Sequence, residues 1–271
     1  MGQLKQLRGA IAELFNSKEI DCSDADWIIV HILKINRSEL NIDRDLTIKQ
    51  IKQIYKLAKK RFRGVPLSQI LGVVNFYGLD FNVNKNVLSP RPETELLVEQ
   101  ILQENKAKRG LDIGTGSGAI AITLEKMGGI DMTAVDISSS ALKVAKSNNK
   151  KLKTSVKFVK SDLFKKLKNC KYDFIVSNPP YIKSSDIESL DSEVKDHEPI
   201  LALDGGKSGY DYYEKIIASA PKFLKDKGRI YFELGIGQSE YVKKLLEKDF
   251  NNIEIIKDYN KIDRIIKAIK K

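Results

Sequence analysis

The sequence predicts an α/β fold, a largely parallel sheet with helices between its strands, preceded by a small N-terminal helical domain. Three observations support this prediction. The first seventy or so residues carry apolar side chains at helical spacing. From Val73 onward, short apolar runs alternate with amphipathic segments, which is typical of a parallel α/β sheet. A glycine-rich turn follows the first buried run, as in nucleotide-binding α/β domains.

The composition is that of an ordinary globular protein. The 271 residues are 42% hydrophobic and 31% charged, and this length can hold one large domain or two smaller ones. No apolar run approaches the roughly 18 residues of a membrane span, and the N-terminus lacks the layout of a signal peptide. We therefore expect a cytoplasmic protein without a membrane partner. Cys22 and Cys170 lie far apart, so we expect neither a disulfide framework nor a metal site.

The formal net charge of +11 has two interpretations. It indicates either an anionic partner, such as nucleic acid or an acidic protein, or a genome composition that favours lysine. Lysines are densest from Lys143 to Lys171, where eleven of them accompany the single acid Asp162. We favour the composition bias and interpret this stretch as a solvated rim.

The N-terminal region is predicted to be helical throughout. Two stripes of mostly apolar side chains recur at helical spacing: Leu4, Leu7, Ile11 and Leu14, then Trp27, Ile28, His31, Ile32 and Ile35. The pattern continues from Leu46 to Arg61, with Thr47 as the expected N-cap, and Gly64 and Pro66 end it. These features predict a helical domain over residues 1–72.

Strand-like segments follow the helical region. Aromatic and β-branched residues around Gly78 predict a β-hairpin, which we assign to a linker over residues 73–89. Further strands are predicted at 110–113, 132–135, 156–159, 174–177 and 229–234, with candidates for two more at 253–256 and 264–268. These strands, with helices between them, predict an α/β domain over residues 90–271.

A glycine loop leaves the first strand of this domain and enters a helix. It contains Gly114, Thr115, Gly116, Ser117 and Gly118. Glycine permits positive φ angles and a close approach of the backbone to a ligand, and the helix N-terminus suits a carboxylate or phosphate. Asp136 ends the next strand, where a carboxylate can accept hydrogen bonds from ribose hydroxyls. The loop and this acid predict an adenosine-type ligand, either NAD or S-adenosylmethionine.

The segment Asn178-Pro179-Pro180-Tyr181 directly follows a predicted buried strand, where α/β sheets bind ligands. Each proline disfavours helical geometry for the residue before it, so the loop is stiff. The Asn178 side-chain oxygen and the Pro179 carbonyl can accept the two hydrogens of one substrate NH2 group. Tyr181 offers a flat face to a planar substrate.

This arrangement suits methylation of an amide or amine nitrogen. An amide lone pair is delocalised, and two fixed acceptors favour a more electron-rich nitrogen held in line with a sulfonium methyl group. A dehydrogenase would instead need a His, Lys or Tyr arrangement that polarises the hydride acceptor, and the sequence has none in register. S-adenosylmethionine is therefore the predicted cofactor, with S-adenosylhomocysteine as product and no metal required.

These motifs resemble those of the bacterial release-factor glutamine methyltransferase family, over essentially the whole chain. Besides GTGSG and SNPPYI, the stretches VLSPRPETE at 87–95 and EPILAL at 198–203 are similar to family signatures. NPPY alone also occurs in DNA adenine and RNA guanine methyltransferases, but its combination with PRPET and a helical N-terminal domain is more specific. The resemblance implies a class I methyltransferase with a Rossmann-like seven-stranded sheet, in which residues 90–271 are catalytic and residues 1–72 dock the substrate.

The resemblance also implies a substrate and residue roles. The substrate would be the glutamine in the GGQ loop of peptide-chain release factors, so that methylation modulates translation termination. The implied substrate contacts are Asn178, Pro179, Pro180 and Tyr181, of which Asn178, Pro179 and Tyr181 are catalytic. The implied cofactor contacts are Gly114, Thr115, Gly116, Ser117, Gly118, Asp136, Asp162, Leu163 and Asn178. Some members have an aromatic residue where this chain has Leu163, which replaces a stacking contact to adenine by an aliphatic one.

Three charged residues of these signatures are open to two roles. Arg91, Glu93 and Glu198 either line the pocket or hold the linker against the catalytic domain, and we favour the structural role. Two other functions are alternatives to that of the family. A nucleic-acid amino-methyltransferase, acting on adenine N6 or guanine N2, shares the NPPY chemistry and would explain the positive charge. The chain lacks a separate target-recognition domain, so we do not expect a direct nucleic-acid substrate. Intact Asn178 and Tyr181 disfavour a non-catalytic adapter.

Overall fold

The computed structural model describes residues 2–104, 108–168 and 170–271; Met1, with which the predicted helical domain begins, lies outside them. The chain forms two compact units, Met1–Gly72 with Ser192–His197, and Val73–Asp191 with Glu198–Lys271. The segment Ser192–His197 thus packs in the helical unit, although the sequence-based range 90–271 includes it.

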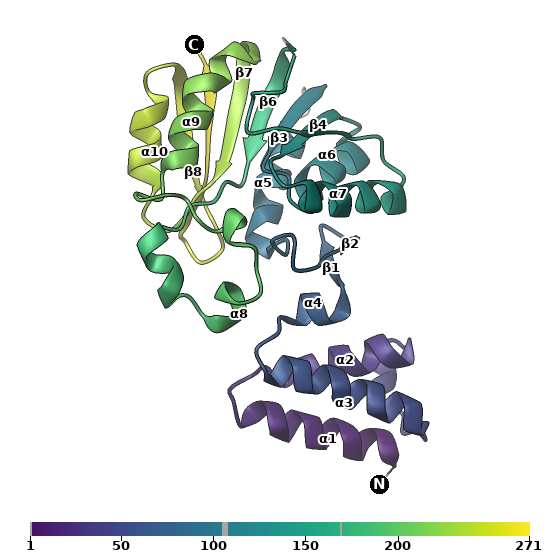
Figure 1. Ribbon diagram of the computed structural model, residues 1–271. Coiled ribbons are helices and arrows are strands. Elements are labelled where there is room, and N and C mark those ends of the chain that lie inside the picture. The colour runs from purple at the N-terminus through teal and green to yellow at the C-terminus, as the bar shows by residue number, and fades with distance from the viewer. Residues whose placement is uncertain (1, 105–107, 169) are drawn as a thin grey trace. The chain divides into compact units, whose positions relative to one another are not determined.

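The first unit is built from helices (Figure 1). They are α1 Gln3–Asn16, α2 Ser23–Leu33, the 3-10 helix η1 Arg37–Asn41, α3 Ile48–Phe62, α4 Leu67–Leu71 and α8 Ser192–Lys195. Thr47 caps α3 as predicted, because its hydroxyl accepts the Gln50 N–H while the Gln50 side chain accepts the Thr47 N–H. Buried Arg61 of α3 binds Asp24 of α2 and Glu193 of α8, which fastens α8 to the helices that precede it.

The second unit contains a seven-stranded sheet, as predicted. Its strands are β3 Arg109–Ile113, β4 Asp131–Asp136, β5 Lys157–Lys160, β6 Tyr172–Ser177, β7 Leu224–Glu233, β8 Phe250–Lys257 and β9 Asp263–Lys270. The strand order is β5-β4-β3-β6-β7-β9-β8. The pairs from β5 to β7 are parallel, whereas β9 runs antiparallel between β7 and β8. The predicted hairpin forms a separate two-stranded sheet of β1 Val73–Phe76 and β2 Leu79–Asn82.

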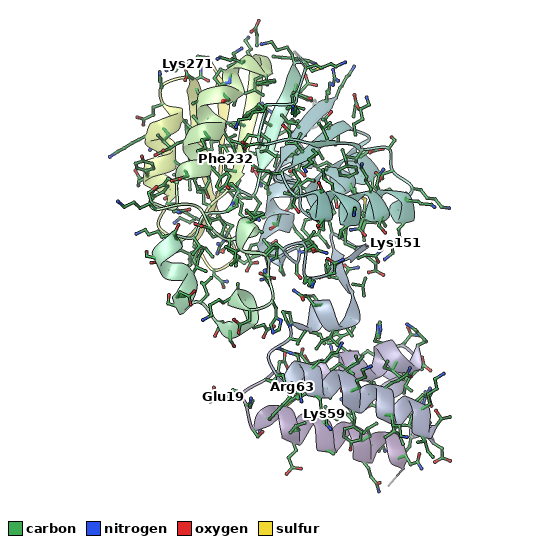
Figure 2. All side chains as sticks on the ribbon, in the orientation of Figure 1. Glu19, Lys59, Arg63, Lys151, Phe232 and Lys271 are labelled. Atoms are coloured by element: carbon green, nitrogen blue, oxygen red, sulfur yellow. The ribbon has the colours of Figure 1, made fainter. Side chains whose placement is uncertain are left out.

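Helices cover both faces of this sheet (Figure 1). The longer ones are α5 Pro92–Gln103, α6 Ala119–Gly128, α7 Ser139–Leu152, α9 Asp211–Ser219 and α10 Ser239–Leu246, and the 3-10 turns are η2 Ser184–Ser189, η3 Ile200–Ala202 and η4 Ala220–Lys222. Strand side chains alternate between the two faces. On β7, Phe232 packs with α9 and α10, whereas Tyr231 packs with α5 and α6. Phe232 lies inside the unit, and Lys151 and Lys271 lie at its surface (Figure 2).

The strand order reverses at β3, which pairs with β4 on one side and with β6 on the other. A crevice forms at such a reversal, because the loops that leave the two strands diverge to opposite sides. The loops after β3, β4 and β6 therefore meet at one edge of the sheet. Within the described part of the chain, no helix is long and apolar enough to cross a membrane.

Candidate active site

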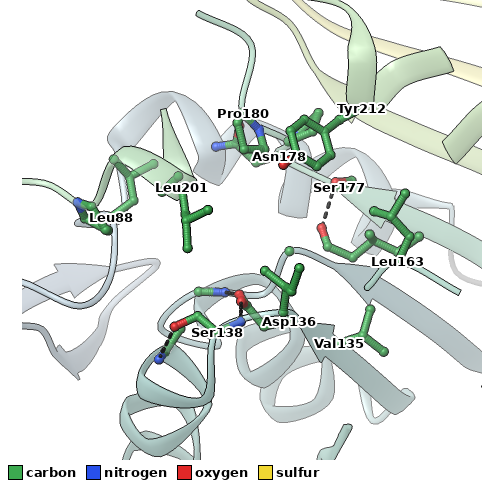
Figure 3. Close-up of a pocket in the computed structure, with 18 of the residues that line it drawn as sticks. Leu88, Val135, Asp136, Ser138, Leu163, Ser177, Asn178, Pro180, Leu201 and Tyr212 are labelled. Carbon is green, nitrogen blue, oxygen red and sulfur yellow. Dashed lines mark hydrogen bonds between the residues drawn. The ribbon is translucent and has the colours of Figure 1, made fainter. Parts of the chain in front are cut away.

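A cavity lies at the carboxyl ends of β3, β4 and β6 (Figure 3). Asp136 and Ser138 lie on one side of it, and Asn178 and Pro180 lie across from them. Apolar side chains complete the wall, among them Leu88, Leu163, Leu201 and Tyr212. The cavity thus brings together the glycine loop, the acid after the second strand and the NPPY segment, which the sequence places in separate stretches.

Gly114 and Gly116 line the cavity in conformations that require glycine. Their φ angles are +75° and +56°, and no atom lies within 4 Å of a Cβ built on either residue. A side chain at either position would strain the backbone and project into the open cavity. The backbone can consequently approach a ligand closely along this loop.

The other three residues of the loop stabilise its conformation. Thr115 donates its hydroxyl to Asp112 at 2.6 Å, and the Ser117 carbonyl accepts the Asn148 side-chain amide at 2.9 Å. Gly118 has a φ of +83° where α6 begins, and a Cβ there would meet Ile122 at 2.8 Å. None of Thr115, Ser117 and Gly118 is among the cavity-lining residues of the described chain, so their direct contact with a cofactor stays a prediction.

Asp136 lines the cavity and anchors the glycine loop. Its Oδ2 accepts the Gly116 N–H at 2.9 Å, and its Oδ1 accepts the Ser138 N–H at 2.8 Å. Each carboxylate oxygen has a second lone pair, which leaves capacity for ligand hydroxyls. Burial raises the pKa of Asp136, whereas hydrogen bonds from Ser138 and Gly116 lower it.

Asp112 is fully buried in β3, one residue before the strand ends at Ile113. Burial raises its pKa to about 7, and the hydrogen bond from Thr115 opposes that rise. Asp112 holds the loop through its hydrogen bond with Thr115 and is not among the cavity-lining residues of the described chain, so it supports the loop and does not form a wall of the cavity.

Asp162 and Leu163 line the cavity beyond the end of β5. Leu163 has a φ of +46°, an uncommon conformation for a residue with a branched side chain. Asp162 forms an ion pair with Lys165 at 2.6 Å on an exposed surface. Both residues lie where an adenine contact was predicted, and that contact itself stays a prediction.

Asn178, Pro179 and Pro180 line the cavity, but Tyr181 is not among its lining residues. Gln238, in the loop after β7, donates to the Tyr181 carbonyl at 3.0 Å. Burial raises the pKa of the Tyr181 hydroxyl to about 12, so this ring stays neutral. The catalytic roles of Asn178, Pro179 and Tyr181 stay predictions.

Two polar residues behind Asn178, Thr94 and Glu233, are not predicted from the sequence. The Thr94 hydroxyl donates to Glu233 Oε2 at 2.6 Å, and Asn178 Nδ2 donates to the Thr94 hydroxyl at 3.3 Å. Glu233 is only 2% exposed, and burial raises its pKa to about 7. The available signal was a carboxylate at the end of the apolar strand RIYFE, because an acid rarely stands there without a partner.

Arg91 and Glu198 form an ion pair, with the Arg91 guanidinium 2.9 Å from both carboxylate oxygens. The Glu198 side chain is 2% exposed and that of Arg91 44%. The pair joins the chain before α5 to the chain before η3. Arg91, Glu93 and Glu198 are not among the cavity-lining residues of the described chain.

Comparison with known protein families gives two matches along the chain. Residues 90–193 match the Methyltransferase small domain, and residues 6–72 match the PrmC N-terminal domain. The chain is 38% identical to the release factor glutamine methyltransferase of Thermodesulfovibrio yellowstonii, over 94% of this chain and 95% of that protein. It is 39% identical to the Bacillus cereus protein of the same name, over 92% of each.

Two solved structures share the fold of this chain. A methyltransferase from Pyrococcus furiosus superposes with a TM-score of 0.57 at 19% identity, covering 72% of this chain and 90% of that one. The hMettl16 catalytic domain, in complex with a 3′UTR hairpin, superposes with a TM-score of 0.59 at 20% identity, covering 78% of this chain and 81% of that one. At these identities the likeness concerns the fold alone.

Proposed function

Because the chain belongs to the release factor glutamine methyltransferase family, we propose that it methylates the side-chain amide nitrogen of a glutamine in a peptide-chain release factor. It is an S-adenosylmethionine-dependent enzyme with the class I methyltransferase fold. The glutamine we propose is that of the GGQ loop, and its methylation would modulate translation termination. For such a substrate we expect a cytoplasmic location.

One observation carries the proposal: Asp136, at the end of β4, and Asn178, in the loop after β6, line the same cavity. Asp136 belongs to the part of the site suited to a ribose, and Asn178 to the part suited to an NH2 group. A methyl donor and a methyl acceptor must lie side by side for in-line transfer. One cavity therefore has room for the donor next to Asp136 and for the acceptor next to Asn178.

The residues around the glycine loop fit the cofactor. Gly114 and Gly116 form a cradle with open space where side chains would stand, and the Asp136 carboxylate faces the same space. A half-buried carboxylate suits both ribose hydroxyls and a nearby positive charge. When bound, S-adenosylmethionine supplies an electrophilic methyl group on a sulfonium.

The acceptor nitrogen is prepared by the NPPY loop. We propose that the Asn178 Oδ1 and the Pro179 carbonyl accept the two hydrogens of the glutamine NH2 group, which fixes its plane and raises the electron density on nitrogen. The prolines keep these acceptors in place before the substrate arrives, which lowers the cost of reorganisation. After transfer the nitrogen becomes acidic and loses its proton without a strong base.

Mass spectrometry tests the proposed function. The full-length protein is incubated with methyl-labelled cofactor and, in separate reactions, an unmodified release factor, the same factor with its GGQ glutamine changed to alanine, and DNA or RNA duplexes. We expect label on the GGQ glutamine alone. Label on adenine N6 or guanine N2 with none on the release factor would reassign the enzyme to nucleic-acid methylation.

A further inference from the structure

A hydrogen-bond chain runs from Glu233 through Thr94 to Asn178. The Thr94 hydroxyl donates to Glu233 Oε2 at 2.6 Å and accepts from Asn178 Nδ2 at 3.3 Å. Thr94 is 4% exposed and Glu233 2%. The three residues belong to α5, to the end of β7 and to the loop after β6, so only the folded chain assembles them.

The Thr94 hydroxyl determines which group donates and which accepts in each of these hydrogen bonds. A threonine hydroxyl has one hydrogen, and Thr94 donates it to the Glu233 carboxylate. Its oxygen can then only accept, so the group of Asn178 that faces it must be the NH2 end of the amide. The Asn178 amide also donates directly toward Glu233 and lowers the pKa of that acid. The other end of the amide, Oδ1, is left for the cavity that Asn178 lines.

We propose that Thr94 and Glu233 are positioning residues for methyl transfer, which orient the Asn178 amide so that its oxygen, and not its nitrogen, meets the substrate NH2 group. This inference rests on the proposed function, in which that NH2 belongs to a glutamine. With the amide reversed, the Asn178 NH2 group would face the substrate NH2 group, so two donors would meet. The substrate would then keep only one of its two proposed acceptors, the Pro179 carbonyl. Preorganised polar groups of this kind contribute most when they need no reorientation during the reaction.

The Thr94 hydroxyl and the Asn178 amide keep this orientation only while the Glu233 carboxyl group is ionised. Burial raises its pKa to about 7, Thr94, Arg264 and Asn178 lower it, and Glu93 raises it. The negative charge of Glu233 in turn raises the pKa of the Tyr181 and Tyr213 hydroxyls. A protonated Glu233 can donate to the Thr94 oxygen, which frees the threonine hydrogen to meet Asn178 Oδ1 and permits the reversed amide. Ionisation of Glu233 should therefore favour the productive orientation.

Substitutions at Thr94 test the chain directly. Single-turnover methylation of release factor is measured with saturating cofactor and substrate at about pH 8.5, where Glu233 is ionised. We expect Thr94→Val, which keeps the shape but removes the hydroxyl, to lower the rate about 10-fold or more, and Thr94→Ser to stay within about threefold of the wild type. Cofactor affinity should stay within about twofold in both variants.

Thr123→Val is the matched control. Thr123 lies fully buried on α6, and its hydroxyl has no hydrogen-bond partner among the described residues, so the same substitution should leave the rate unchanged. A normal rate for Thr94→Val, or a Thr94→Ser variant as slow as Thr94→Val, would overturn the proposed positioning role. A wild-type enzyme that labels no glutamine would refute the proposed function instead.

A second variant keeps the proposal testable if Thr94→Val does not fold. Glu233→Gln retains the size of the side chain but cannot ionise. We expect the wild-type single-turnover rate to rise about fivefold or more from pH 6 to pH 8, and the variant to lack that rise and stay slower at pH 8. Asp112, whose pKa also lies near 7, is present in both proteins, so the difference between the profiles isolates Glu233. Identical profiles would overturn the proposal.

Discussion

Asp136 connects two parts of the site through one side chain. Its two oxygens hold the Gly116 and Ser138 N–H groups, and its carboxylate faces the cavity. We expect Asp136→Ala to weaken cofactor binding by about 1–3 kcal/mol, because ligand hydroxyls lose a partner and the loop loses its anchor. Titration calorimetry measures the change.

Asp131→Ala is the control, at the opposite and exposed end of the same strand. It should leave cofactor affinity unaltered. An Asp136→Ala variant that binds cofactor as tightly as the wild type would remove Asp136 from the site.

Asn178 is the residue on which the proposed chemistry depends most. We expect Asn178→Ala to reduce single-turnover methyl transfer about 100-fold or more, with the fold intact and cofactor binding at most moderately weakened. Asn178→Asp keeps an acceptor but loses the Nδ2 donor to Thr94 and adds a second acid near Glu233. Its rate should lie between those of Asn178→Ala and the wild type.

Single-turnover rates at saturating cofactor separate chemistry from binding. A near-normal rate for Asn178→Ala would contradict the mechanism. An Asn178→Asp rate no higher than that of Asn178→Ala would mean that accepting hydrogen bonds is not the essential role of this side chain.

At the scale of elements, the chain after η3 supports the NPPY loop. The Gly205 N–H donates to the Ile182 carbonyl at 2.7 Å, and the Ile182 N–H donates to Leu203 at 3.0 Å. A Cβ on Gly205 would lie 2.7 Å from the Tyr181 Cα, closer than real contacts allow. We expect Gly205→Ala to displace the loop and lower methyl transfer about 10-fold or more, since small misplacements of the reacting groups are costly.

Gly9→Ala is the matched control for this substitution. No atom lies within 4 Å of a Cβ at Gly9, which is inside α1, so the rate should not change. Alanine there should raise the free energy of unfolding by up to about 1 kcal/mol. A Gly205→Ala enzyme with normal rate would show that the NPPY loop does not depend on this contact.

The strands of the sheet could be predicted because each is a short apolar run bounded by turn residues. Most boundaries fall within two residues of the prediction, but β7 begins at Leu224, five residues before the predicted Arg229. The extra residues include Lys225, Asp226 and Lys227, which have no strand-like pattern. Pairing of Leu224 with Tyr172 across an irregular register extends the strand, and no local pattern predicts such a pairing.

The site was predictable only where its residues form contiguous motifs. The glycine loop, Asp136 and the NPPY segment each lie at the carboxyl end of a strand, and parallel strands bring these ends to one edge of the sheet. The bond between Thr94 and Glu233 joins residues 139 positions apart and depends on how α5 packs against the sheet. The inward turn of Thr115 toward Asp112 is likewise a packing outcome, since the motif alone does not say which side chains face the ligand.

At the scale of the whole molecule, the predicted site residues all belong to the second unit and none to the helical unit. Residues 1–72 contain thirteen basic and eight acidic side chains, a net charge of +5 that can steer an acidic partner. We expect a variant lacking Met1–Gly72 to fold, to bind cofactor normally and to methylate intact release factor at least about 10-fold less efficiently. The kcat/KM for the intact protein substrate measures this loss.

A short peptide containing the GGQ sequence is the control substrate. The truncated and full-length enzymes should methylate this peptide with similar kcat/KM, because it reaches the cavity without docking. Undiminished activity of the truncated enzyme on intact release factor would refute a docking role for the helical unit.

One segment of the helical unit, Ser192–His197, is synthesised long after the rest of that unit. Glu193 lies 2.8 Å from the Arg61 guanidinium, and the Gln69 side chain donates to the His197 carbonyl at 2.6 Å. A chain emerging from the ribosome N-terminus first cannot form these bonds until Ser192–His197 has been translated. Until then, Arg61 can form its ion pair with Asp24, because Asp24 has already been translated. Co-translational folding of this first unit is thus completed only after β3 to β6 of the second have been made.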